Sequence, residues 1–122
     1  MSKTALILYA HGARDPDWAS PLHRVKAAIC ALSPETRVEV AFLELMQPRL
    51  QDCAASLADE GFTRIVILPM FIAQGGHIKK DTPVIVDALR ARYPQVAFEL
   101  AGPVGEAEAI VIAIATHALG FL

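Results

Sequence analysis

Two histidines stand where an expected strand gives way to a glycine turn. His11 follows the apolar run LILYA and precedes Gly12, and His77 follows the run PMFIA and a Gln-Gly-Gly turn. An imidazole can ligate a metal ion or move a proton near neutral pH, and glycine lets a ligand approach the backbone closely. The two histidines are therefore the first candidates for a functional site, provided that the fold brings them together.

Four short apolar runs provide the frame for these histidines. We predict strands at residues 4–10, 37–43, 64–71 and 96–100. The first and third runs are apolar on both faces, as central parallel strands are, whereas the second and fourth carry a glutamate and fit the edges of a sheet. Because helical patterns separate the runs, the sequence predicts an α/β sandwich with a parallel sheet.

The segments between the runs have helical periodicity and recognisable ends. Ser20 and Pro21 begin the first helix, which Ser33-Pro34 closes, and the second helix runs from Pro48 to Gly61. Asp81 or Thr82 caps a third helix before Pro83, Pro94 ends it, and a fourth covers residues 106–119. The expected inner faces are Leu22, Val25, Ile29 and Leu32 in the first, Leu50, Cys53, Ala54 and Leu57 in the second, and Val84, Leu89 and Tyr93 in the third.

The strand order decides whether the histidines meet. A small sheet with the first and third strands at its centre favours the flavodoxin-like order 2-1-3-4, a single three-layer domain. Ligands of such sheets bind at the carboxyl ends of the strands, and neighbouring strands lie about 4.8 Å apart. His11 and His77 follow the two central strands, so both imidazoles can reach one ion or small ligand. Glu44, just past the second strand, lies on the same edge.

Charged and apolar residues accompany the histidines at this edge. Arg14, Arg49, Lys79 and Lys80 fall in loops or helix starts there and can together hold an anionic ligand, or they can be ordinary surface charges. Glu44 can belong to the site, be a solvated residue at the end of the strand, or pair with Arg49. The apolar residues nearby, which suggest a wall or a subunit contact, are Met46, Phe71 and Ile72.

The composition indicates a one-domain globular protein and argues against several other classes. The 122 residues suit one domain, and a chain that is 54% hydrophobic but only 7% aromatic should have an aliphatic core. The net charge of −2, with both signs scattered, argues against a nucleic-acid partner. Cys30 and Cys53 lack the spacing of a zinc site and are expected to be buried. No apolar run fits a secretory signal or a membrane span, so we expect a cytoplasmic protein.

Three segments carry a resemblance to a known family. They are HGARDP at residues 11–16, VAFLEL at 40–45, and LPMF at 68–71 leading to GGH at 75–77. In this order and in a chain of this size, they resemble the short sirohydrochlorin chelatases of the CbiX type, within the class II chelatase superfamily. One departure is Ala13, which stands where the family motif His-Gly-Ser-Arg has a serine, so a hydroxyl is missing near the site.

The resemblance implies a chelatase-like fold over residues 1–122 and an activity. The activity is insertion of a divalent metal, Co²⁺ or else Fe²⁺ or Ni²⁺, into sirohydrochlorin on a route to cobalamin or siroheme, without an organic cofactor. The resemblance also implies that His11 and His77 bind the metal and act in catalysis, with Glu44 supporting them by acid/base chemistry or metal contact. The many carboxylates of sirohydrochlorin suit Arg14, Lys79 and Lys80 as substrate-binding residues.

A second subunit is implied as well. Larger members of the family consist of two similar halves with a cleft between them, and a short chain supplies only one half. We therefore expect a symmetric homodimer that holds the tetrapyrrole between its subunits, with Met46, Phe71 or Ile72 in the contact.

Two other enzyme classes fit poorly, and one non-enzymatic alternative stays open. Histidine phosphatases need an arginine before the histidine that follows the first strand, and Ala10 stands there. A serine hydrolase would need a Gly-x-Ser-x-Gly turn, which the chain lacks. A metal- or tetrapyrrole-binding protein that keeps the fold without catalysing insertion remains compatible with Ala13.

Overall fold

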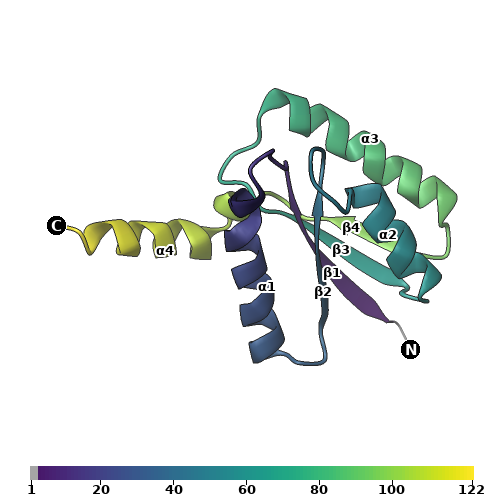
Figure 1. Ribbon diagram of the computed structural model, residues 1–122, viewed down its shortest axis with the longest axis horizontal. Coiled ribbons are helices and arrows are strands. Elements are labelled where there is room, and N and C mark those ends of the chain that lie inside the picture. Colours follow the sequence, from purple (N-terminus) through teal and green to yellow (C-terminus); the bar gives the residue numbers. More distant parts are fainter. Residues whose placement is uncertain (1–2) are drawn as a thin grey trace.

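Four parallel strands form one sheet in the computed structural model, which describes residues 3–122 (Figure 1). The strands are β1 (Thr4–Ala10), β2 (Arg37–Phe42), β3 (Arg64–Pro69) and β4 (Ala97–Leu100), in the order β2-β1-β3-β4. The predicted parallel sheet, its strand order and the central position of the first and third runs are thereby confirmed. β1 pairs with β2 along one side and with β3 along the other.

Helices cover the two faces of the sheet unequally. The helical elements are the 3₁₀ turn η1 (Pro16–Ala19), α1 (Ser20–Leu32), α2 (Leu50–Asp59), α3 (Gly76–Arg92), the 3₁₀ turn η2 (Val104–Glu106) and α4 (Glu108–Leu119). α2 and α3 lie on one face and α1 on the other, which gives the three expected layers (Figure 1). α4 covers neither face and projects away from the sheet (Figure 1). No helix among residues 3–122 is long and apolar enough to cross a membrane.

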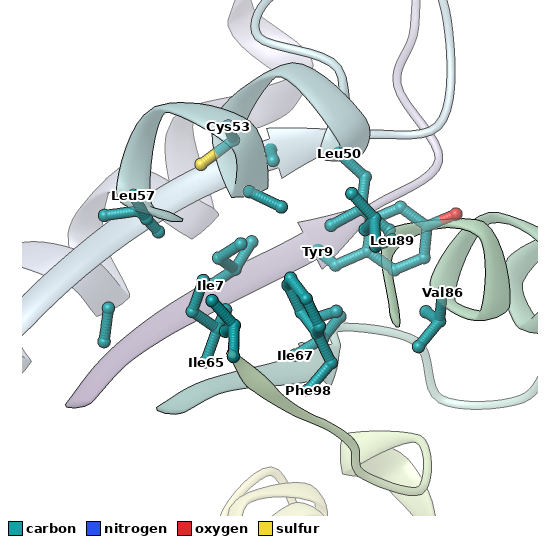
Figure 2. Close-up of a cluster of buried hydrophobic side chains, with 14 of the residues drawn as sticks. Ile7, Tyr9, Leu50, Cys53, Leu57, Ile65, Ile67, Val86, Leu89 and Phe98 are labelled. Carbon is teal, nitrogen blue, oxygen red and sulfur yellow. The ribbon is translucent and has the colours of Figure 1, made fainter. Parts of the chain in front are cut away.

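The main core lies between the sheet and helices α2 and α3. Alternate residues of β1 and β3, such as Ile7 and Ile67, point to this face and are fully buried (Figure 2). The apolar stripe predicted for α2 meets them, and all its members are buried: Leu50, Cys53, Ala54 and Leu57. Burial raises the pKa of the Cys53 thiol to about 11. Cys30, which was expected to be buried, is only half-buried on α1.

Helix α1 departs from its predicted inner face. It begins and ends where expected, but only Leu22 is buried, and Ile29 packs partly against the core. Val25 and Leu32 are exposed, to 36% and 87%. The prediction for these two residues was wrong because a helix on one side of an open sheet face buries only the stripe directly above the strands.

Helix α3 begins well before the predicted cap at Asp81 or Thr82. It starts at Gly76 and contains Pro83 in its interior. Its buried residues Ile78, Thr82, Val86 and Leu89 follow helical spacing, so one continuous inner face extends across the proline. Burial of that face outweighs the loss of one helical hydrogen bond at Pro83. Val84, predicted to face the core, is 69% exposed.

The core predicts a clear contrast between two truncations. Leu50→Ala removes a fully buried side chain and should lower the free energy of unfolding by about 2–5 kcal/mol. Val84→Ala removes an exposed side chain of α3 and should change it by about 0.5 kcal/mol or less. Urea unfolding followed by circular dichroism measures both values, and equal losses in the two variants would contradict the assigned core.

Candidate functional site

Backbone pairing of β1 with β2 continues past the ends of both strands. The Leu43 amide donates to the Ala10 carbonyl at 2.9 Å, and the Glu44 amide donates to the His11 carbonyl at 3.0 Å. Because this pairing sets the two residues side by side, their side chains meet as well, with His11 Nε2 2.7 Å from Glu44 Oε1. Both side chains are about half exposed, at 41% and 49%.

Gly12 makes this close approach possible. Its φ of +99° lies in the left-handed region that side chains disfavour. A Cβ atom at this position would overlap the carbonyl oxygen of Glu44. The glycine after His11 therefore allows the chain to turn while its backbone lies directly against the residue that contacts the imidazole.

The neighbouring loop, between β3 and α3, is tied to β1 as well. The Met70 amide donates to the Tyr9 carbonyl at 2.7 Å. The Phe71 ring packs edge-to-face on Tyr9, with 6.0 Å between ring centres. The loop that leads to His77 thus starts directly beside the end of β1.

The start of α3 is fixed by a buried polar contact. The Tyr9 hydroxyl lies 3.0 Å from the Thr82 hydroxyl. The Tyr9 side chain points toward α3, the helix that also carries Val86 (Figure 2). Burial is the main cause that raises the pKa of Tyr9. The hydrogen bond between Tyr9 and Thr82 lowers this pKa, and the charges of Asp81 and Glu44 raise it further. Tyr9 therefore keeps its proton at neutral pH and serves as a neutral anchor.

His77 is the second residue of α3, directly after Gly76. The predicted pair of histidines is thus found at the same edge of the sheet, one after β1 and one in the first turn of the helix that follows β3. The side chain of His77 lies outside the described part of the structure, so its contacts are not part of the geometry. Within the described residues, no three His, Cys, Asp or Glu side chains form a group that could hold a metal.

The four predicted basic residues all follow the carboxyl end of a strand, in loops or helix starts. Arg14 follows β1, and Lys79 and Lys80 lie in the first turns of α3, all exposed. Arg49 lies at the start of α2, beside Phe42 at the end of β2, and its Nε contacts Asp52 at 3.3 Å. The alternative pairing of Arg49 with Glu44 is not adopted, since Glu44 contacts His11.

The edge is open rather than enclosed. One cavity of about 450 Å³ lies between α2 and α3, lined by residues such as Ala55 and Ala88. Another, of about 470 Å³, lies beside β2 and is lined by Lys26 and Glu39 among others. Neither of these cavities includes His11 or Glu44, and both of those side chains are about half exposed, so the edge faces solvent.

Two positioning contacts were not predicted from the sequence. The pair of Tyr9 and Thr82 was missed because the third helix was expected to start too late. The sequence feature that could have indicated this contact is the spacing of Thr82 four residues after Ile78, which places both on one face of a longer helix. The second is Gly105, whose amide donates to the Phe71 carbonyl at 2.9 Å, and no local pattern marks that contact.

Comparison with known proteins gives consistent matches. The CbiX family model matches residues 5–118. The sirohydrochlorin cobaltochelatase of Methanopyrus kandleri is 33% identical over 79 residues, which cover 65% of this chain and 55% of that protein. The sirohydrochlorin ferrochelatase of Bacillus subtilis is 28% identical over 116 residues, which cover 92% of this chain and 43% of that protein.

A solved structure shares the fold along nearly the full length. The CbiX protein from Marinobacter aquaeolei VT8 superposes with a TM-score of 0.83 and 26% identity, covering 96% of this chain and 95% of that one. The two curated relatives are longer, and this chain spans only about half the length of each.

Two glycine variants test the backbone approach at the site. Gly12→Ala combines a strained φ with the overlap on Glu44, whereas Gly61→Ala has a similar φ of +95° and nothing within 4 Å. We expect Gly61→Ala to cost about 1–2 kcal/mol of unfolding free energy, as left-handed strain does, and Gly12→Ala to cost clearly more. Urea unfolding of both proteins compares the costs. Equal costs would show that Gly12 does not lie against Glu44.

Proposed function

Because the chain belongs to the CbiX family, we propose that it inserts a divalent metal ion into sirohydrochlorin. The observation that carries the proposal is the 2.7 Å contact between His11 and Glu44 at the carboxyl edge of the sheet. His77 enters the same edge on the first turn of α3. A pair of imidazoles beside a carboxylate is suited to hold a metal ion and to accept protons.

The reaction defines what the residues must do. Insertion replaces two pyrrole N–H protons with the metal, so the site must deliver a partly desolvated ion and take up two protons. When His11 Nε2 carries the hydrogen that Glu44 accepts, Nδ1 keeps its lone pair for the metal or a proton. A carboxylate that accepts from one ring nitrogen also fixes the tautomer and the orientation of the ring.

We assign roles on that basis. His11 and His77 bind the incoming metal and, once it has left for the tetrapyrrole, receive the pyrrole protons. Glu44 orients His11 and passes the proton on to solvent, which its half-exposed side chain can reach. The metal is a substrate, and no organic cofactor takes part in this scheme.

The identity of the metal follows from supply more than from the ligands. Imidazole suits iron, cobalt and nickel alike, and affinity rises in that order for most sites. Co²⁺, Fe²⁺ and Ni²⁺ are therefore all candidate substrates, and the curated relatives are named for cobalt and for iron.

The exposed basic residues fit the other substrate. Sirohydrochlorin carries many carboxylates, and Arg14, Lys79 and Lys80 offer positive charge at the same edge. The amino end of α3 adds backbone N–H groups, since no side chain caps it. These positive charges lie together at one edge of a chain whose net charge is −2, so they would attract the carboxylates of the tetrapyrrole. The ring would then bind with its carboxylates pointing away from the histidines.

The open edge favours a second subunit. We propose that residues 1–122 form one chelatase domain and that two copies hold the tetrapyrrole between them, because one chain covers only one side of the ligand. Ile72, 75% exposed beside the site, is the best placed of the predicted contact residues, whereas Phe71 is engaged with Tyr9. The free thiols of Cys30 and Cys53 are compatible with a reducing cytoplasm, and we propose neither nucleic acid nor membrane as partners.

An insertion assay tests both the activity and the role of His11. Wild-type protein mixed with Co²⁺ and sirohydrochlorin should change the visible spectrum faster than the reagents alone. His11→Ala should lower the insertion rate by about 10²–10⁴-fold, the range for loss of a general base. Glu44→Gln should lower it by about 10–100-fold, as loss of a group that orients a ligand does.

His23→Ala is the matched control, because His23 is exposed on α1 and lines the cavity beside β2, which includes neither His11 nor Glu44. It should keep the wild-type rate. Wild-type protein that binds cobalt or sirohydrochlorin without accelerating insertion would instead indicate a binding protein. A His11→Ala variant at full rate would remove His11 from the mechanism while leaving the activity in place.

The basic residues predict a separate effect on substrate affinity. Lys79→Gln combined with Lys80→Gln should raise KM for sirohydrochlorin by about 10-fold with little change in kcat, since the lost charges act on bound substrate throughout the reaction. Added salt should narrow the difference. Lys26→Gln, whose lysine contacts Glu39 beside β2, is the control and should leave KM unchanged. A drop in kcat alone would contradict a substrate-binding role.

A further inference from the structure

Helix α4 is apolar on every side and is not packed on the rest of the chain. None of its residues is buried. Its large side chains include Ile112, 55% exposed, and Leu119, 65% exposed, and Phe121 just beyond it is 79% exposed. The helix projects away from the sheet (Figure 1). A helix that is apolar all round belongs in a protein interior or a lipid environment, so α4 requires a surface that covers it.

On the face of the sheet that carries α1, one strip over β3 and β4 is not covered by a helix. Val66 and Leu68 on β3 and Met70 just after it are only half-buried, whereas Ile65 and Ile67 on the opposite face are fully buried. α1 lies over β1 and β2 on this side, and the exposed Ala97 of β4 extends the open area. The same face also carries the ion pair of Arg64 with Glu99, at 2.7 Å, which borders the apolar groups. Parallel sheets normally have both faces covered by helices, so this strip of β3 and β4 is a vacant helix position.

One flank of α1 forms a second apolar wall for that position. Lys26 reaches around the sheet to Glu39 of the edge strand β2, at 3.1 Å. Val25 and Leu32 lie on the opposite flank of α1 by helical geometry, and therefore face the side of β3. Both are exposed. The vacant position is thus bounded by apolar groups on the sheet and on α1.

The chain's own α4 is directed away from this position. The turn η2, which leads into α4, is bound to the loop after β3 through the Gly105 amide and the Phe71 carbonyl at 2.9 Å. Gly105 packs so closely on the Ile72 backbone that any Cβ atom would overlap it. While this contact holds, α4 leaves the body pointing outward.

The surface area is that of a protein missing a partner. A folded monomer of 13.1 kDa is expected to expose about 6,400 Å². This chain exposes 7642 Å². The surplus of roughly 1,200 Å² exceeds the approximately 800 Å² per partner that a stable interface buries. α4, with 12 residues and about 18 Å long, also matches the roughly 20 Å of the six-residue strand β3.

We propose that two copies of this chain exchange their α4 helices, so that α4 of each copy packs on the open face of β3 and β4 of the other. The inference rests on the symmetric dimer proposed above and specifies its surface. The exchange also concerns the site, because α4 starts beside Ile72, on the loop that leads to His77. The partner's body would therefore lie next to the open edge and supply its missing wall.

A charge placed on α4 tests the surface. Ile112→Lys should raise the dissociation constant of the dimer by about 100-fold or more, since the charge enters both copies of the contact. Val84→Lys, on α3 and on the opposite face of the sheet, is the control and should leave the dimer intact. Analytical ultracentrifugation of the full chains at several concentrations measures both constants, and circular dichroism confirms that each variant is folded.

Cross-linking then separates exchange from other arrangements. The double variant Leu68→Cys with Ile114→Cys, in a Cys30→Ala background, is treated with a flexible bis-maleimide and run on a denaturing gel. Exchange predicts a covalent dimer, whereas α4 folded back on its own sheet would give an internally linked monomer. Val84→Cys in place of Ile114→Cys is the matched control and should give no linked product.

Each outcome decides a separate part of the proposal. A dimer with links between chains supports exchange. A dimer with internal links, or with none, overturns exchange and leaves the dimer and the chelatase activity standing. A monomer overturns exchange and the dimer together, and insertion activity measured on the same sample shows whether the proposed function survives. A monomer that binds phosphatidylglycerol vesicles through α4 would assign the helix to a lipid surface and also overturn exchange.

Discussion

The structure depends on the double pairing of the central strand β1. Its hydrogen bonds to β2 and β3 fix the register on both sides, and the same pairing extends beyond the strand to Glu44 on one side and to Met70 on the other. A shift of one residue would turn every side chain to the opposite face of the sheet. The contact between His11 and Glu44 is therefore a consequence of sheet register, and the buried alternation of β1 and β3 specifies it.

Much of this arrangement follows from local sequence. The runs at residues 4–10 and 64–71 are apolar on both faces, as central strands of a parallel sheet are, and this pattern places His11 and His77 after neighbouring strands. The stripe on α2 and the stop near Gly61 were predicted for the same reason, since burial and a left-handed glycine both leave local signals. The proximity of Glu44 to His11 followed from the strand order.

The parts that local sequence did not predict depend on contacts distant in the chain. Pro83 suggested a helix start, yet α3 begins at Gly76 because Thr82 and its neighbours are held against β1. Val25 and Leu32 have helical spacing suited to a core, but whether they are covered depends on another helix, α4. A periodic pattern shows that a face is apolar, and only the tertiary structure decides what covers it.

Helix α4 is the clearest case of an apolar pattern whose covering surface is not local in the sequence. Its position was predicted from its apolar residues, but it lacks the polar face that a surface helix of a monomer has. Each Val, Ile or Leu side chain that such a helix buries contributes about 1.5–3 kcal/mol, and a chain that leaves several of them in water forgoes that contribution. Under the proposed exchange, the same burial would hold two copies together and set the second wall of the site beside Ile72.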